Sequence, residues 1–289
     1  MSETRKKRIT LAEAEEKYLH RFRKYLREEE KSAATIEKYM RDVKHFLCFA
    51  GGDRKLEKEL VLEYKEQLSK TYAITSANSM LASLNSFLKF AGYAGCCVRQ
   101  HRIQRQIYCP KEKELTEAEY LRLVHTAEKA GNKRLSLVLQ TICGTGIRVS
   151  ELEYITLEAA RRGEALVTCK GKTRTVFLPE KLQQKLRHYC KEKQISSGTI
   201  FLTSSGKPMN RSNIWREMKN LCEQAGVAPS KVYPHNLRHL FARSFYCREH
   251  DVAKLADILG HSSIETTRIY VVSTGTEHRK KINDMGLIP

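Results

Sequence analysis

Apolar side chains recur every three or four positions through the first ninety residues, which is the spacing of one face of an α-helix. The pattern predicts four helices, over residues 10–30, 32–51, 56–68 and 76–90. Ser32 is placed to cap the second helix, and the Gly51–Gly52 pair is placed to end it. On the fourth helix, Asn78 and Asn85 lie away from the apolar stripe and are available outward. Four short amphipathic helices predict a compact first domain.

A change of pattern follows the fourth helix. Residues 92–110 hold two glycines, two adjacent cysteines and a basic run without sustained periodicity, which indicates a linker. Thr116 and Glu119 then form a capping-box pattern that begins another helix. The sequence therefore predicts a first domain over 1–95, a linker over 96–112 and a second domain over 113–289.

Helical spacing dominates the second domain, with one exception. Between residues 165 and 178, β-branched and apolar residues flank Lys170-Gly171, as in a tight hairpin, and residues 199–202 are a candidate third strand. Later helix starts are marked by Asn210 or Ser212, by Pro234 and by Asp251. The predicted fold class is mainly α: a four-helix N-terminal domain and a mostly α C-terminal domain with a small antiparallel sheet.

Charge narrows the class of partner. The 289 residues include 52 Lys and Arg against 33 Asp and Glu, a formal charge of +19, which favours nucleic acid as the partner. The longest apolar stretch, near residues 135–147, is too short for a membrane helix. Residues 1–10 form a basic arm without the features of a signal peptide. Nine cysteines without a Cys-x-x-Cys pair indicate free thiols, Cys96 and Cys97 among them, and a reducing cytoplasm or nucleoid.

Cofactor chemistry finds little support in the sequence. Aspartates are few and scattered over both domains, so no carboxylate cluster for a metal-dependent nuclease is evident. The phosphate-binding loop of nucleotide motors is also missing from the sequence. We expect neither a metal nor another cofactor.

The second domain instead carries four separated groups of cationic, imidazole and phenolic side chains. They are Gly146 to Leu152, Lys170 to Arg174, His235 to His239, and Leu259 to His261 followed nine residues later by Tyr270. Together they resemble the tyrosine site-specific recombinases, the family of lambda integrase, Cre and the Xer enzymes, and most closely its compact Xer-like members. The resemblance covers nearly the whole chain, and it implies that the first domain is the core-binding (SAM-like) domain and the second the catalytic domain.

The resemblance implies six catalytic residues: Arg148, Lys170, His235, Arg238, His261 and Tyr270. The transition state at a DNA phosphate carries negative charge on its equatorial oxygens, which suits two arginines and a histidine donor. Tyr270 would attack the phosphorus to form a 3′-phosphotyrosine, and His235 would take the phenolic proton.

A hairpin lysine would protonate the leaving 5′-oxygen. The family pattern points to Lys170, but the hairpin looks one residue shorter than in many relatives, so Lys172 stays a possible substitute. Glu151 is expected to hold the Arg148 helix, and His239 is expected to face elsewhere on its helix with a structural role.

Further expectations concern partners. The resemblance also implies that the second and fourth helices and the helix near Arg211 face DNA; a place on the solvated surface, without DNA contact, is the alternative for each candidate residue. These candidates are Lys38, Arg41, Lys44, Arg211, Asn213, Arg216 and Lys219. The family's apolar C-terminal tail, here residues 274–289, docks into a neighbouring protomer, which implies a homotetramer on two DNA duplexes.

The expected function is site-specific recombination through a Holliday junction, for integration and excision, inversion or dimer resolution. The alternatives are a type IB topoisomerase-like enzyme and a DNA-binding regulator without activity.

Overall fold

The computed structural model describes residues 11–51, 54–103, 113–169, 171–261, 263–271 and 283–286. The chain divides into two compact units, residues 1–105 and 106–289. The predicted basic arm, Lys170 and the tail apart from residues 283–286 lie outside the described residues.

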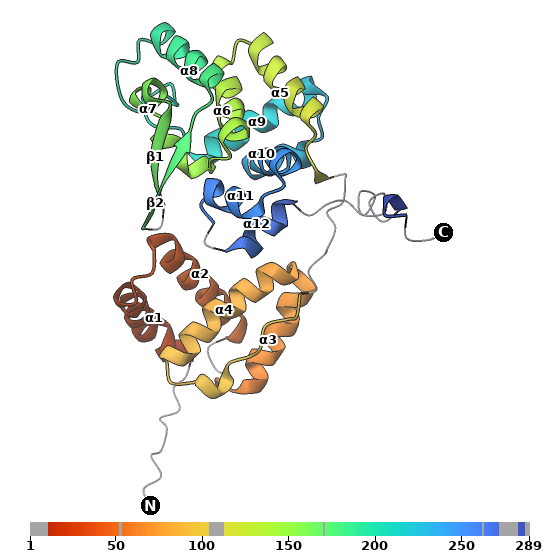
Figure 1. The fold of residues 1–289 in the computed structure, drawn as a ribbon. Helices are drawn as coiled ribbons and strands as arrows, with labels where there is room; N and C mark the ends of the chain where they lie inside the picture. Colours follow the sequence, from red (N-terminus) through yellow and green to blue (C-terminus); the bar gives the residue numbers. More distant parts are fainter. Residues whose placement is uncertain are drawn as a thin grey trace, which may run out of the picture. The chain divides into compact units, whose positions relative to one another are not determined.

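The first unit contains the four predicted helices (Figure 1). Their bounds are α1 Leu11–Glu28, α2 Ala33–Ala50, α3 Lys58–Thr71 and α4 Ile74–Phe90, with a short 3₁₀ helix η1 at Ala94–Cys96. Ser32 caps α2 as predicted, because its hydroxyl accepts from the amide of Thr35 at 3.3 Å. Aromatic and leucine side chains from all four helices, such as Phe22, Phe46 and Phe87, are buried in one core.

The polar side of α4 holds part of its own chain. Asn78 donates to the carbonyl of His101 at 2.9 Å and accepts from the amide of the same residue at 2.7 Å. Asn85 binds Val98 in the same two ways, at 2.8 and 3.0 Å. The prediction that these two amides are available outward is therefore wrong, since they hold residues 98–101 against the helix. Such side-chain pairing satisfies backbone groups of a segment that has no helix or strand of its own.

The second unit is mostly helical. Its helices are α5 Glu117–Lys129, α6 Lys133–Thr145, η3 Val149–Tyr154, α7 Leu157–Arg162, α8 Glu180–Glu192, α9 Arg211–Ala225, η4 Pro229–Lys231, α10 Pro234–Glu249, α11 Val252–Leu259 and α12 Ile264–Val271. The predicted capping box of Thr116 and Glu119 is present, and Asn210 and Asp251 cap α9 and α11. These local signals fix where the helices that carry the candidate site begin.

The predicted hairpin is also present. Strands β1 (Glu164–Cys169) and β2 (Lys172–Phe177) pair antiparallel, with Cys169 opposite Lys172 at the turn. The expected third strand is wrong within the described residues, where Thr199 and Leu202 form only isolated bridges, to Thr156 and Pro208. Directly after Leu202 the chain turns back, and the amide of Thr203 donates to the carbonyl of Lys207 at 2.7 Å.

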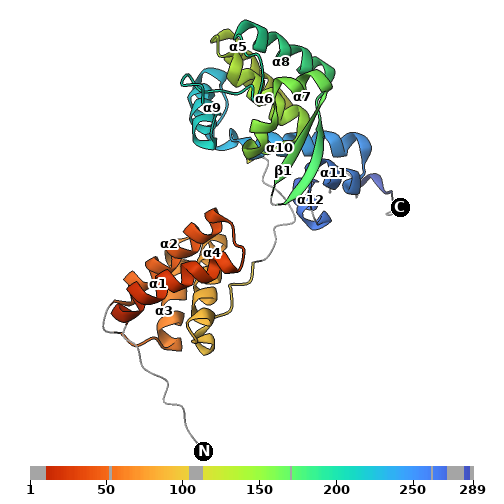
Figure 2. The ribbon, with the colours of Figure 1, turned by 90° about the vertical axis from the view of Figure 1, so that its left-hand side faces the viewer.

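Two clusters of buried side chains hold the second unit together. The larger includes the apolar faces of α5 to α9, and a small one joins Ala242 of α10, Leu255 and Leu259 of α11 and Tyr270 of α12. Helices α10, α11 and α12 thus lie side by side, with the hairpin reaching toward α11 (Figure 2). Cys96 and Cys97 are free thiols as predicted. Among the residues described here, no helix has the length and apolar character needed to cross a membrane.

Candidate active site

Arg148 lies at the junction between α6 and η3. Helix α6 ends at Thr145 and is capped by Gly146, whose left-handed backbone (φ +65°) turns the chain. Arg148 precedes the first residue of η3. A Cβ at Gly146 would lie 2.4 Å from the ring of Phe241, so glycine is required by both backbone and space. The turn leaves the Arg148 side chain only half-buried.

Glu151 holds Arg148 in place through hydrogen bonds. Its carboxylate accepts from the amide of Arg148 at 2.8 Å and from Nη1 of Arg148 at 3.0 Å. Arg174 of β2 donates to both carboxylate oxygens, at 2.9 and 2.8 Å. Glu151 is 1% exposed, and although burial favours the protonated form, these donors lower the pKa of its carboxyl to about 2. A carboxylate held ionised between two guanidinium groups is a structural anchor and has no proton to give at neutral pH.

Arg238 is buried on α10, one turn after His235, and is 1% exposed. Its Nη1 donates to the carbonyl of Gly146, and its Nη2 donates to the carbonyl of Leu259 at 2.7 Å and to Nε2 of His261 at 3.0 Å. Burial, followed by the charge of Arg148, lowers the pKa of Arg238 to about 10, so it stays charged at neutral pH. The guanidinium thereby joins α6, α10 and α11.

The two predicted histidines are held neutral. Burial, then the charges of Arg238 and Arg148, lowers the pKa of His261 to about 4, and the same causes, with Arg211, lower the pKa of His235. A guanidinium only donates, so Nε2 of His261 accepts from Arg238, and the ring carries its proton on Nδ1, 2.8 Å from the hydroxyl of Thr267.

Tyr270 completes the arrangement from the end of α12. Its phenol ring lies 5.4 Å from the ring of His235 and 5.2 Å from that of His261, and the guanidinium carbon of Arg238 is 5.9 Å from its centre. The residue is 6% exposed. The structure therefore brings together Arg148, His235, Arg238, His261 and Tyr270, which come from four separate segments of one chain.

Comparison with known proteins agrees with this arrangement. Residues 19–95 match a family model described as "Phage integrase, N-terminal SAM-like domain". Residues 113–277, more than half of the chain, match the model "Phage integrase family". The chain belongs to the phage integrase family.

Relatives of this family member extend over nearly its full length. Tyrosine recombinase XerA of Pyrococcus furiosus is 29% identical over 277 residues, covering 93% of this chain and 94% of XerA. Tyrosine recombinase XerD of Staphylococcus saprophyticus is 29% identical over 279 residues, covering 88% and 92%. Family and relatives make the chain a tyrosine recombinase, an enzyme class that cleaves and rejoins DNA strands.

Solved structures show the same fold. The crystal structure of XerA recombinase aligns with a TM-score of 0.54 at 26% identity, covering 95% of this chain and all of the other. A lambda integrase tetramer bound to a Holliday junction aligns at 0.72 and 20% identity, covering 91% of this chain and 78% of that one. The predicted fold class is confirmed.

The hairpin lysines of this recombinase are not placed. Lys170 lies outside the described residues, and only the backbone of Lys172 is described, as the first residue of β2. The choice between Lys170 and Lys172 therefore stays a prediction.

Two further residues belong to the site. His239, expected to face elsewhere, stacks on the Tyr270 ring with centres 4.2 Å apart, so that expectation is wrong. It lies four residues after His235 and therefore on the same face of α10, a spacing that could have located it. Arg174, which belongs to the Lys170 to Arg174 group but was given no role there, ties β2 to Glu151 and donates to the carbonyl of Ile258 at 3.3 Å.

The predicted DNA contacts of the first unit differ in how free they are. Lys38 forms an ion pair with Asp42, which is 4% exposed, and donates to the hydroxyl of Ser83 at 3.2 Å. Arg41 and Lys44 are exposed. The ammonium of Lys38 is thus engaged inside its own unit. Lys44 presents its charge to solvent, and so does Arg41, although its Nη2 lies 3.6 Å from the carboxylate of Asp42.

In the second unit the candidates lie on α9. Arg211 and Arg216 are exposed, Asn213 forms part of the cap at the helix start, and Lys219 lies 5.3 Å above the ring of Trp215. The charge of Arg211 contributes to the lowered pKa of His235, so the start of α9 lies near the candidate active site.

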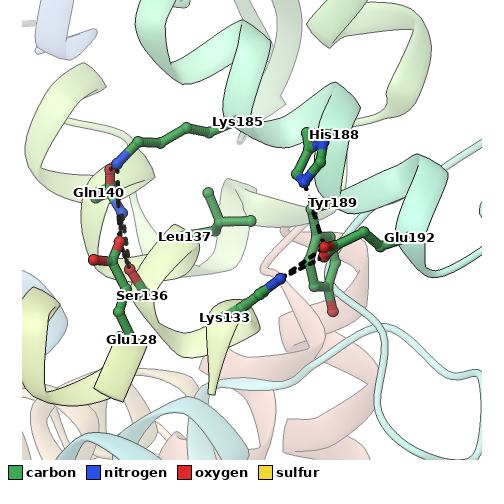
Figure 3. A pocket seen from close by; sticks show the side chains of 9 residues that line it. All are labelled: Glu128, Lys133, Ser136, Leu137, Gln140, Lys185, His188, Tyr189 and Glu192. Atoms are coloured by element: carbon green, nitrogen blue, oxygen red, sulfur yellow. Dashed lines mark hydrogen bonds and ion pairs between the residues drawn. The ribbon is translucent and has the colours of Figure 1, made fainter. Parts of the chain in front are cut away.

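A pocket of about 310 Å³ lies elsewhere in the second unit, between α6 and α8 (Figure 3). Its charged side chains are paired with one another: Lys133 with Glu192 at 2.7 Å, and Lys185 with Glu128 at 3.8 Å. Lys185 also donates to the amide oxygen of Gln140 at 2.8 Å. Leu137 forms the apolar part of its wall. None of the five expected catalytic residues that the structure describes lines it, so this pocket is separate from the site that they form.

Proposed function

We propose that the chain is a site-specific recombinase that breaks and rejoins duplex DNA through Tyr270. The observation that carries this proposal is the position of the Tyr270 phenol, which lies beside Arg238 and between the expected base and the expected phosphate donor of the same chain. A nucleophile held next to its base and to fixed cations is the arrangement that phosphoryl transfer requires.

In the proposed step, the phenolic oxygen of Tyr270 forms a bond to phosphorus, and the bond between phosphorus and the 5′-oxygen breaks. The phenolic proton passes to His235, whose lowered pKa keeps its ring neutral and able to accept. The leaving 5′-oxygen takes a proton from Lys170, with Lys172 as the substitute. One phosphodiester is exchanged for another, so rejoining is the same step in reverse and needs no external energy source.

Arg148 and Arg238 bind the non-bridging oxygens of the phosphate. The partly exposed side chain of Arg148 is accessible, and the buried Nε of Arg238 has no hydrogen-bond partner among the described residues, which leaves it free to donate. His261 serves as a third donor once Nε2 is released from Arg238 and carries the proton. The Thr267 hydroxyl supports this shift, because it can either accept from Nδ1 or donate to it.

Double-stranded DNA is the proposed partner, bound by a homotetramer on two duplexes. Solved structures of similar proteins support this reading: lambda integrase as a tetramer on a Holliday junction, and XerH on its difH substrate. Phosphate contacts are assigned to Arg41, Lys44, Arg211 and Arg216, with Asn213, Lys219 and Lys38 as weaker candidates because each is already bound within its unit.

The test uses the full chain and a pool of duplexes of randomised sequence. Complexes that survive denaturing electrophoresis are recovered, and the attached DNA is sequenced, which also yields the target site. We expect wild type to form a 3′-linked adduct and Tyr270→Phe to form none while still binding the recovered duplex. Tyr246→Phe, in the same small cluster, is the matched control and should react as wild type. A covalent adduct with Tyr270→Phe would overturn the proposal.

A further inference from the structure

Among the aromatic rings that the structure describes, that of His239 lies closest to the Tyr270 ring. The two ring centres are 4.2 Å apart with an angle of 29° between the planes, whereas the His235 and His261 rings lie 5.4 and 5.2 Å away. His239 also meets His235 edge to face at 4.7 Å, as residues four apart on one helix do. The two histidines of α10 therefore form one aromatic surface against which the phenol packs.

The state of His239 suits packing better than proton transfer. Burial, followed by the charges of His235, Arg243 and Arg238, lowers its pKa to about 4, so its ring is neutral at physiological pH. The ring presents its face to the face of the phenol. A proton acceptor for a tyrosine meets the hydroxyl edge-on with a nitrogen lone pair, in the plane of the imidazole. Offset stacking of two neutral rings is instead a favourable contact of dispersion and quadrupoles.

Tyr270 needs such a surface because of where it lies. It is the next-to-last residue of α12, a helix of eight residues, and this helix packs on α10 and α11 (Figure 1). Two turns of helix restrain their last side chains weakly. Attack on phosphorus requires the oxygen within about 3–3.5 Å of its target, and a misplacement of about 1 Å costs on the order of 10²-fold in rate.

We propose that His239 is a positioning residue, whose imidazole face holds the Tyr270 phenol in the orientation from which it attacks. The inference rests on the proposed role of Tyr270 as nucleophile. In this role, what matters about His239 is its flat ring, and the residue neither accepts nor donates a proton in the reaction.

The test compares three substitutions in the full chain on the duplex recovered with wild type. His239→Phe keeps a flat ring, while His239→Ala and His239→Gln remove it. With DNA bound at saturation, we expect the ringless variants to cleave about 10–10²-fold more slowly, with DNA affinity within about twofold of wild type. The phenylalanine variant should cleave within about fivefold of wild type, because the stacking surface remains, and should keep the wild-type dependence of cleavage on pH. His188→Ala, on the exposed side of α8, is the control histidine and should not change the rate.

The outcomes separate the two proposals. If Tyr270→Phe still forms the adduct, the nucleophile is wrong, whatever the His239 variants do. If wild type links through Tyr270 but His239→Phe is as slow as the ringless variants, the imidazole nitrogens matter and the positioning role is refuted. Ringless variants that cleave at the wild-type rate refute it as well. Melting curves identify any variant that is unfolded, and the glutamine variant replaces alanine if alanine does not fold.

Discussion

Replacing Glu151 with glutamine removes the negative charge that holds Arg148 in place while nearly keeping the shape of the side chain. Four donors converge on this carboxylate, from the amide and Nη1 of Arg148 and from both Nη atoms of Arg174. Glutamine has nearly the same shape but one oxygen and one amide group, so its NH₂ faces donors that it cannot accept from. The substitution leaves two guanidinium groups without an anion in a buried place.

The size of the effect follows from the carboxyl pKa. A fall from 4.5 to about 2 corresponds to roughly 3 kcal/mol of stability, and breaking a buried pair by removing one partner costs about 3–5 kcal/mol. Because the pKa is depressed in the folded state, this stability is fully present above pH 4.5 and is lost as the pH falls through about 2. At pH 7 the variant should therefore be about 3 kcal/mol less stable than wild type, and the difference should shrink between pH 4.5 and 2.

The assay is urea unfolding of the full chain at several pH values, followed by circular dichroism, together with the cleavage rate at pH 7. Glu153→Gln, two residues away on η3 and exposed, is the matched control and should change stability little. A loss below about 1 kcal/mol for Glu151→Gln at pH 7, or a difference that does not shrink in acid, would refute the anchoring role of this carboxylate.

Three further predictions address the reaction and the DNA contact. Lys170→Ala should lose cleavage of normal DNA and regain it on a duplex with a 5′-bridging sulfur, which leaves without a proton; selective rescue of Lys172→Ala would move the acid role to that residue. The single-turnover cleavage rate should rise with pH and reach its plateau before pH 6.5, because the lowered pKa of His235 means that its ring has already lost its proton there and can accept one. An inflection above pH 6.5 would contradict the assignment of His235 as base. Trp215, the only tryptophan in the chain and half-exposed on α9, should change its fluorescence when DNA binds, with an affinity that falls steeply as salt rises; an unchanged signal at saturating DNA would argue against α9 as a DNA-facing helix.

The elements that carry the site could be predicted because their signals are local. Ser32, Asn210 and Asp251 cap the helices that they were expected to cap, and the residues on either side of Lys170-Gly171 in the sequence form two paired strands. A cap or a tight turn depends on a few neighbouring residues, so the sequence alone contains the information.

Contacts between distant segments were not predictable in the same way. Asn78 binds the backbone of His101, and Arg174 binds Glu151. In neither pair does the separation along the sequence follow a helical or strand period that would have predicted the contact. His239 is an intermediate case. One step along a helix from Arg238 turns the side chain by about 100°, which suggested another direction, but four steps from His235 return it to the same face.

The buried guanidinium of Arg238 is held in part by main-chain oxygens, those of Gly146 and Leu259. A carbonyl is supplied by every amino acid, so exchange of the side chain at position 259 leaves that acceptor available as long as the backbone keeps its path. Many substitutions of neighbouring side chains therefore leave the hydrogen bonds of this guanidinium unchanged. The arrangement is vulnerable instead to substitutions that move the backbone, such as one that adds a β-carbon at Gly146.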